Sequence, residues 1–309
     1  MNWQASSTRW GSAARKKNRR EPGDARETDP TERSGTSGGT FTEDKGERGF
    51  AVELPTYRLD LHIHTVLSPC TEIADMTPRA IVRAALEQGL HMIAICDHNS
   101  ARNTAATRRA ARGSGLTVIP GIEVTTSEEA HIVGLFPGDL EAEAAQEEIY
   151  SRLVGENDEE AFGYQVVVNE HDEVEDLDKR LLIGATTLSS ERVADLIHRL
   201  NGLVIAAHVD RSGFGIFSQL GFIPEGLALD ALEVSKRSDF ETVKKTYRQS
   251  RNYPLLASSD AHYIADIGTV FTRVRMAEPS FRELQKALKG TDGRSVLEEA
   301  GRRADCGVP

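Results

Sequence analysis

The sequence predicts an α/β barrel, and three observations lead to this prediction. From Tyr57 onward, short apolar runs alternate with amphipathic segments, as in strands joined by helices in a mainly parallel sheet. About 250 residues hold enough of these units to favour a (β/α) barrel over an open doubly wound sheet. Nearly every apolar run also carries a His, Asp or Glu at or just past its end, where barrel enzymes place their sites.

Local signals predict the elements in chain order. A first strand is expected over 57–64 and a helix over 76–89, where Thr77 suits the N-cap, Pro78 the first helical position and Gly89 the stop. The other strands are expected over 91–96, 116–124, 130–136, 202–208, 228–235 and 254–262. The other helices are expected within 100–115, over 189–202, near 239–250 and over 279–290.

Residues 140–188 break this rhythm with an acidic amphipathic helix and a long, charged connector. An insertion of this length is typical of a lid over a barrel mouth, and an acidic surface loop is the equally weighted alternative. Lys179 and Arg180 are the cations to test if a lid meets an anionic substrate. The predicted organisation is a disordered tail over 1–52, a barrel domain over 53–290 that contains this insertion, and a C-terminal tail over 291–309.

The composition limits the classes of binding partner that we expect. A formal net charge of −11 argues against a mainly electrostatic grip on long nucleic acid or an anionic membrane. No apolar run approaches the roughly 20 residues that span a bilayer. The three cysteines, Cys70, Cys96 and Cys306, are too few for a disulfide framework. We therefore expect a cytoplasmic protein without a membrane partner; the sequence leaves its oligomeric state open.

Polar side chains gather at the ends of the predicted strands. The runs read LDLHIH, IAICDHN, VIPGIEV, AHIVGLF, VIAAHVDR, ALEVSK and LLASSDAH. Six of the nine histidines fall here: His62, His64, His98, His131, His208 and His262. Because residues i and i+2 of a strand share a face, His62 and His64 project together and can share one ion at about 2.0–2.1 Å each. Together the strand ends predict a metal centre.

Structural roles compete with functional ones at several positions. Asp97 could be a ligand, a supporting group or the N-cap of the next helix. Glu123 inside a barrel would need neutralising, which a metal does. His131 begins its run, so a satisfied buried histidine is its alternative. His208 and Asp260 are firmer candidates. Further supporting or substrate-binding candidates are Asp210, Arg211, Glu233, Lys236 and Ser259.

Five ordered motifs, DLHIHT, DHN, GIEV, AHVD and SSDAH, resemble the PHP (polymerase and histidinol phosphatase) superfamily over roughly residues 57–275. The resemblance implies a distorted (β/α)7 TIM-like barrel with a cluster of two or three divalent ions, Mn, Fe or Zn, at its C-terminal mouth. It also implies phosphoesterase activity.

The resemblance assigns the ligands. His62, His64, Glu123 and Asp260 would bind one ion, and Glu123 would bridge to a second ion held by His131 and His208. His98 and His262 would hold a third. The family usually adds a His or Asp from the loop after the first motif; here that loop reads TVLSPC, so Cys70 is the nearest candidate, with Glu72 and Asp75 further on.

The expected function is hydrolysis of a small phosphomonoester by a metal-activated hydroxide, with a small phosphorylated substrate and no long nucleic acid. Asp97, or a residue of the lid, would protonate the leaving oxygen, and Arg211 with Lys236 would hold the phosphate. Two alternatives stay open: an amidohydrolase-type metal hydrolase, although the middle strand offers Glu123 and no lysine, and a non-enzymatic metal-binding regulatory domain.

Overall fold

The computed structural model describes residues 53–71 and 75–303. The predicted N-terminal tail over 1–52 lies outside the described residues. The strands of the main sheet are β1 (Thr56–Ile63), β2 (Met92–Ile95), β3 (Thr117–Thr125), β4 (His131–Leu135), β7 (Leu203–Ala206), β8 (Ala231–Val234), β9 (Leu255–Ala257), β10 (Val270–Arg275), β11 (Ser295–Val296) and β12 (Gly301–Arg302). Nine of them follow the order β11-β10-β1-β2-β3-β4-β7-β8-β9, and β12 pairs with β10.

This sheet is nearly closed. The segment after β9 returns to β1, where the Ala261 carbonyl accepts a hydrogen bond from His64 N at 3.0 Å and Ala261 N donates to the His62 carbonyl at 3.3 Å. Seven strands, β1 to β4 and β7 to β9, therefore surround one interior, and the predicted barrel-like α/β fold is confirmed.

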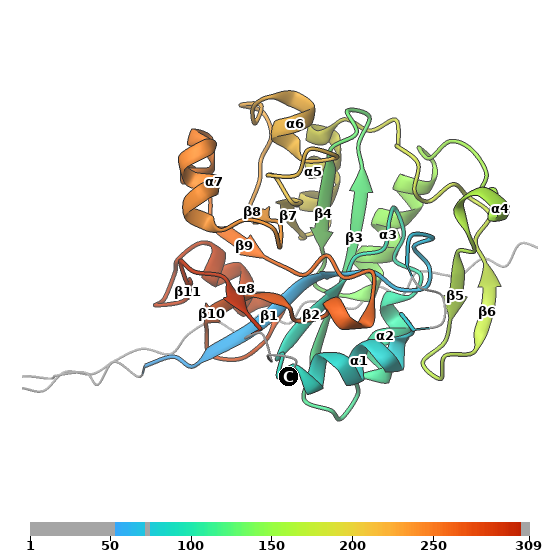
Figure 1. Cartoon of the computed structure of the whole chain (residues 1–309), viewed down its shortest axis with the longest axis horizontal. Coiled ribbons are helices and arrows are strands. Elements are labelled where there is room, and N and C mark those ends of the chain that lie inside the picture. The colour runs from blue at the N-terminus through green and yellow to red at the C-terminus, as the bar shows by residue number, and fades with distance from the viewer. Residues whose placement is uncertain (1–52, 72–74, 304–309) are drawn as a thin grey trace, which may run out of the picture. The chain divides into compact units, whose positions relative to one another are not determined.

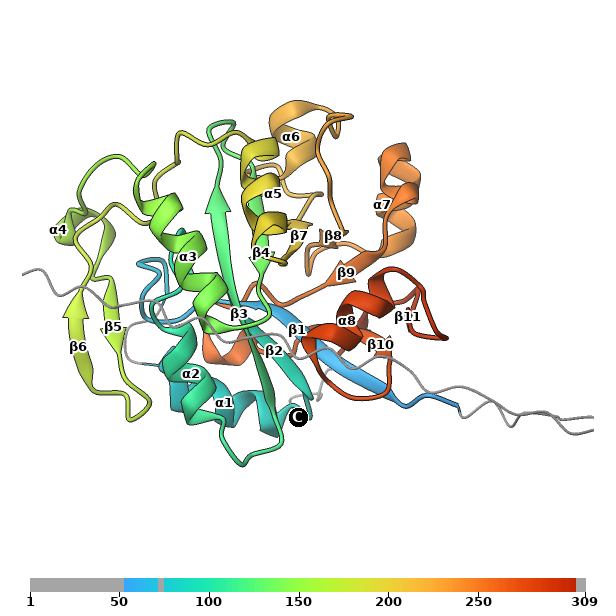
Figure 2. The ribbon, with the colours of Figure 1, turned by 180° about the vertical axis from the view of Figure 1, so that it is seen from behind.

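Helices cover the outside of this sheet. They are α1 (Pro78–Glu87), α2 (Thr104–Ala110), α3 (Asp139–Tyr150), α5 (Ser190–Arg199), α6 (Ile216–Leu220), α7 (Phe240–Thr246) and α8 (Phe281–Leu288). Figure 1 shows α1 and α2 on one side of the barrel and α7 on the other, and Figure 2 shows α3, α5 and α8 against the back of the strands. Pro78 opens α1 and Gly89, at φ +65°, follows its end, as the sequence predicts.

One strand of the barrel runs backwards. β4 is antiparallel to both β3 and β7, whereas β1–β2, β2–β3, β7–β8 and β8–β9 are parallel. The first residue of β4, His131, therefore pairs with Thr125 at the end of β3. This reversal places a residue that begins its strand at the same mouth as residues that end theirs.

An irregularity in the pairing of β1 with β2 lies at the histidine pair. Leu59 and Leu61 both belong to the apolar cluster that fills the barrel, together with inward residues such as Met92 and Ile205. The register between β1 and β2 shifts between Asp60 and Ile63, and Ile63 packs with the outer cluster under α1. The shift interrupts the alternation of the strand, so His62 and His64 face the interior above the apolar layer.

The insertion packs beside the barrel. It contains α3, α4 (Glu159–Phe162) and the hairpin of β5 (Val166–Val168) and β6 (Val174–Leu177), which stands at one edge of the fold (Figure 1). Asn99 at the mouth donates from Nδ2 to the carbonyls of Leu182 and Gly184, both at 2.8 Å. Residues 291–303 contribute β11 and β12; the predicted division into a barrel domain and tails stays a prediction. Within the described ranges, no helix is long and apolar enough to cross a membrane.

Candidate metal centre

The structure gathers all eight predicted metal ligands at the barrel mouth. They come from β1, the turn after β2, β3, the start of β4 and the loops after β7 and β9: His62, His64, His98, Glu123, His131, His208, Asp260 and His262. Six of them are at most 6 % exposed, and the other two, Asp260 and His262, are the more open members at the rim. Titratable groups so deeply buried need neutralising partners.

Glu123 is the centre of this cluster. Its Oε1 lies 2.7 Å from His131 Nδ1 and 3.1 Å from His208 Nε2, while its Oε2 lies 3.0 Å from His98 Nδ1 and 3.4 Å from His64 Nε2. Burial alone would raise the pKa of Glu123, but the surrounding imidazoles hold its pKa well below the usual range. His62 Nε2 also lies 3.4 Å from Oε1, so this one carboxylate reaches five imidazoles with its two oxygens.

Asp260 and His262 close the cluster on the side of β9. Asp260 Oδ1 lies 3.4 Å from His64 Nε2 and 3.7 Å from His62 Nε2. His262 Nδ1 lies 2.9 Å from the Asp260 carbonyl, so Nε2 is its free nitrogen. Two predicted ligands have backbones in the left-handed region, His208 at φ +29° and Asp260 at φ +49°. Non-glycine residues adopt this conformation at a cost, and such strain gathers at functional sites.

Three sets of these residues bring ligand atoms within 4.8 Å of one another: His64, His98 and His262; His62, His64 and Glu123; His98, Glu123 and His131. Buried polar atoms with no hydrogen-bond partner among the described residues include His98 Nδ1, Glu123 Oε2 and His208 Nδ1. Orphaned buried acceptors are rare unless an ion or water satisfies them. The donor set, imidazole nitrogens and carboxylate oxygens, fits Mn, Fe or Zn.

Asp97 does not lie where its predicted catalytic role requires. Its carboxylate is fully buried and accepts three hydrogen bonds of 2.7 Å, from Thr65 N, Thr65 Oγ1 and Ser68 Oγ. It is not among the described residues that line the cavity over the cluster. Burial raises its pKa despite these bonds. Asp97 therefore fixes the loop after β1, and the structure gives no support to Asp97 as the proton donor.

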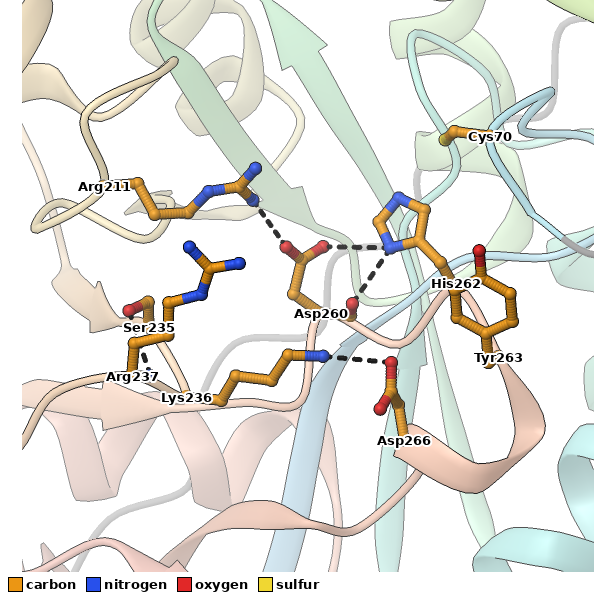
Figure 3. Close-up of a pocket in the computed structure, with 9 residues that line it drawn as sticks. All are labelled: Cys70, Arg211, Ser235, Lys236, Arg237, Asp260, His262, Tyr263 and Asp266. Atoms are coloured by element: carbon orange, nitrogen blue, oxygen red, sulfur yellow. Dashed lines mark hydrogen bonds and ion pairs between the residues drawn. The ribbon is translucent and has the colours of Figure 1, made fainter.

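Arg211, the other predicted catalytic residue, reaches the mouth. Its Nη1 lies 2.7 Å from Asp260 Oδ2. It lines the cavity of about 190 Å³ over the cluster. Phe214, and Ile183 from the insertion, also line this cavity. Arg211 also lines a second cavity of about 280 Å³ alongside (Figure 3). Arg211 is thus placed to meet an anion bound over the cluster.

Cys70 lines both cavities at the rim. Partial burial would raise the pKa of its thiol, but hydrogen bonds with His262 and His98 lower it to about 6. Asp75 is exposed, and Glu72 lies outside the described residues. Whether Cys70 binds metal stays a prediction.

The sequence missed three residues of the mouth. Arg237 and Tyr263 line the second cavity, and Phe214 stacks on His131 with centroids 4.4 Å apart. Strand-end patterns do not single out these loop residues. Conversely, neither Lys179 nor Arg180 is among the described residues that line the two cavities; they pair with Glu159 and Asp178.

Comparison with known proteins agrees with this architecture. A family model for the PHP domain matches residues 60–213, and a model for the PHP-associated region matches residues 244–291. The chain belongs to the PHP family. This confirms the predicted family and, with it, the class of metal-dependent phosphoesterases. The family and the His and Glu clusters support the predicted divalent ions; their number and identity stay predictions, as does each assigned ligand.

Several PHP relatives act on nucleic acid. The chain is 40 % identical over 81 residues to the 5′-3′ exoribonuclease Rnm of Escherichia coli, covering 25 % of this chain and 26 % of that protein. It is 29 % identical over 126 residues to the uncharacterised protein YqxK of Bacillus subtilis, covering 37 % of this chain and 32 % of that one. The lesion-specific endonuclease from Pyrococcus furiosus has the same fold, with a TM-score of 0.60, 20 % identity, and coverage of 79 % of this chain and 58 % of that chain. The chain thus spans only part of each.

These relatives overturn one prediction. The family resemblance predicts a small phosphorylated substrate, and the acidic composition argues against long nucleic acid. The named relatives are instead an exoribonuclease and an endonuclease, and an endonuclease Q is also solved with a 27-mer duplex substrate. The net charge of −11 is a sum over the whole sequence and does not give the local charge at the mouth, on which binding of an anion depends.

Proposed function

We propose that this chain hydrolyses phosphoester bonds of nucleic acid at the barrel mouth, with divalent ions held by the eight clustered residues. The arrangement of Glu123 carries the proposal, because its two oxygens reach five imidazoles within 3.4 Å. Such a set holds neighbouring cations and has little other use in a barrel interior. The nuclease relatives support nucleic acid as the substrate.

The chain's own residues position and neutralise the substrate. Bound divalent ions supply a water of lowered pKa and neutralise charge on the phosphate. Arg211 sits beside Asp260 at the rim, where its guanidinium can pair with a phosphate oxygen and keep the scissile group over the cluster. Phe214 and Ile183 form an apolar wall of the cavity, which limits access of water from that side.

Electrostatics at the mouth suit a polyanion once ions are present. The cluster alone carries the carboxylates of Glu123 and Asp260, which two divalent ions would more than neutralise. Arg211, Lys236 and Arg237 line the adjoining cavity. The mouth therefore becomes locally positive on a chain whose net charge is −11.

The test compares substrates on the metal-loaded protein. Single-stranded RNA and DNA oligonucleotides with a labelled 5′ or 3′ end are incubated with Mn, Fe or Zn, beside a phosphomonoester panel and an amide panel. We expect cleavage of the oligonucleotides, loss of it with EDTA and recovery on adding back metal. The labelled ends then distinguish stepwise trimming from internal cleavage.

Matched variants control this test. His62→Ala and Asp260→Ala should abolish cleavage while the protein stays folded, whereas His171→Ala and Asp195→Ala, at exposed positions away from the mouth, should keep it. Turnover of phosphomonoesters or amides but not oligonucleotides would overturn the proposal. Bound metal without turnover of any ester would favour a regulatory domain.

A further inference from the structure

A second cavity opens beside the metal centre. It has a volume of about 280 Å³ and shares Cys70, Arg211, Asp260 and His262 with the cavity over the cluster. Its remaining lining is Ser235, Lys236, Arg237, Tyr263 and Asp266. Any chain bound over the cluster that extends past Asp260 enters this cavity, which we call the side groove.

The side groove gathers positive charge from two loops. Arg211 follows β7, and Lys236 and Arg237 follow β8; Figure 3 shows Arg211 reaching Asp260, Lys236 reaching Asp266, and the Arg237 side chain extending toward that of Arg211. Arg211 pairs with Asp260 at 2.7 Å and Lys236 with Asp266 at 2.9 Å. Arg237 is exposed and takes part in none of the ion pairs found between described residues. Its charge is therefore available to an anion.

Hydrogen bonds hold the turn after β8, which carries Lys236 and Arg237, in place. Asp210 accepts hydrogen bonds from Ser235 N at 2.7 Å and Ser235 Oγ at 2.6 Å, and Arg237 N donates to Ser235 Oγ at 3.3 Å. Arg302 Nη1 donates to the Lys236 carbonyl at 3.0 Å. The groove is therefore preorganised, which lowers the entropy cost of binding a ligand.

An aromatic face completes the groove. Tyr263 follows His262 directly and is 53 % exposed, so its ring is accessible to a ligand in the groove. Exposed aromatic rings beside cations are the platforms on which single-stranded nucleic acids stack their bases. Tyr263 and Arg237 lie in the same groove, so one nucleotide can contact both.

We propose that the side groove binds the nucleotide next to the scissile phosphate, with Arg237 on its backbone phosphate and Tyr263 stacked on its base. The volume of about 280 Å³ lies just below the range for small-ligand sites, about 300–1,000 Å³, which suits one nucleotide and not a duplex. The groove therefore selects a single-stranded end. This inference rests on the proposed function, since the adjacent cluster must hold the scissile group.

The test compares two phosphodiesters on the metal-loaded protein. Bis(4-nitrophenyl) phosphate has no flanking nucleotide, whereas each phosphodiester of a single-stranded trinucleotide has nucleosides on both sides. We expect Arg237→Ala and Tyr263→Ala each to lower the ratio of kcat/KM for the trinucleotide over the nitrophenyl ester about tenfold. Tyr263→Phe keeps the ring face and should restore the ratio. Arg282→Ala is the matched control, because Arg282 is an exposed arginine in α8, outside the side groove.

Salt dependence gives a second readout. The logarithm of kcat/KM for the trinucleotide falls with the logarithm of salt concentration by about 0.7 for each phosphate contact to a single strand. Arg237→Ala should reduce this slope by about that amount, and Tyr263→Ala should not.

The outcomes separate the two proposals. Hydrolysis of neither diester would refute the proposed function. Fluorescence anisotropy of labelled trinucleotide with the same variants would then test nucleotide binding in the side groove independently of hydrolysis. Hydrolysis of the trinucleotide with unchanged ratio and slope in Arg237→Ala and Tyr263→Ala would overturn the side groove. Equal weakening of single-stranded and duplex substrates would overturn its selectivity.

Discussion

The Nε2 atoms of His62 and His64 lie 3.2 Å apart at the centre of the mouth. The Nδ1 of His62 faces the Glu233 carboxylate at 3.0 Å and must carry its proton. The Nδ1 of His64 faces Ser68 Oγ at 3.0 Å, and Ser68 gives its own hydrogen to Asp97, so His64 Nδ1 also donates. In the neutral rings both Nε2 lone pairs therefore point at each other, an arrangement that needs a cation between or beside them.

A proton fills that need when metal is absent, and this predicts the pH dependence of metal binding. Burial would lower the pKa of His62, but the carboxylates of Glu233, Glu123 and Asp260 raise its pKa well above the ordinary value. At neutral pH the metal-free protein therefore carries a proton that binding must displace, so affinity falls as pH falls. Isothermal titration of Mn or Zn in two buffers of different ionisation enthalpy should show proton release.

His62→Gln provides the control for this prediction, because its amide carries no titrating proton. It should release fewer protons per ion bound, while His171→Ala should match the wild type. Metal affinity that is flat between pH 6 and pH 8 would contradict the assignment of the proton to this pair.

Glu233 should act on the metal through His62. Its carboxylate is 2 % exposed and accepts from His62 Nδ1, fixing the tautomer that leaves Nε2 free. Glu233→Gln keeps an acceptor oxygen but removes the charge that makes the ring a stronger ligand. We expect metal affinity, measured by competition with a chromophoric chelator, to fall about 10–100-fold. Glu225→Gln, at an exposed glutamate, is the matched control, and an equal effect there would contradict the role of Glu233.

The sequence could point to the eight candidate ligands because parallel strands bring their ends to one rim. The sequence could not show that His131 lies at this rim, because the position of His131 depends on β4 running antiparallel to both neighbouring strands. Alternation within a strand carries no information about its direction.

The side groove lay beyond sequence patterns for a different reason. Arg237 and Tyr263 belong to separate loops whose approach depends on barrel closure between Ala261 and β1. Asp97 shows a second limit of the pattern: it stands beside the candidate ligand His98 in DHN, yet Thr65 and Ser68 occupy its carboxylate. Residue type and spacing reveal what can bind metal, and only packing decides which groups are already satisfied.

Asp97→Asn tests that structural role. The amide would turn an NH2 group toward one of three donors that now share the carboxylate at 2.7 Å. Leaving a buried donor unsatisfied should lower the free energy of unfolding by about 1–3 kcal/mol, measured by urea denaturation. Asp195→Asn on the exposed face of α5 should change little. If Asp97 were the proton donor, the variant would instead lose the basic limb of the pH–rate profile with stability unchanged.

Thr272 should hold β9 beside β10 on the side where the main sheet stays open. It is 1 % exposed, and its Oγ1 accepts from Ala257 N at 2.8 Å and donates to the Ala257 carbonyl at 2.9 Å. Thr272→Val keeps the shape but leaves both backbone groups of Ala257 without a partner. We expect the free energy of unfolding to fall by about 1–3 kcal/mol in urea denaturation.

Thr272→Ser distinguishes the contribution of the hydroxyl from that of the packed methyl group. It retains both hydrogen bonds and loses one buried methyl group, which costs about 1 kcal/mol. Because Asp260 follows β9 by three residues, Thr272→Val should also weaken metal binding more than Thr272→Ser does. Equal effects of the two variants on stability and on metal affinity would show that the methyl group, and not the hydroxyl bridge, holds this edge of the mouth together.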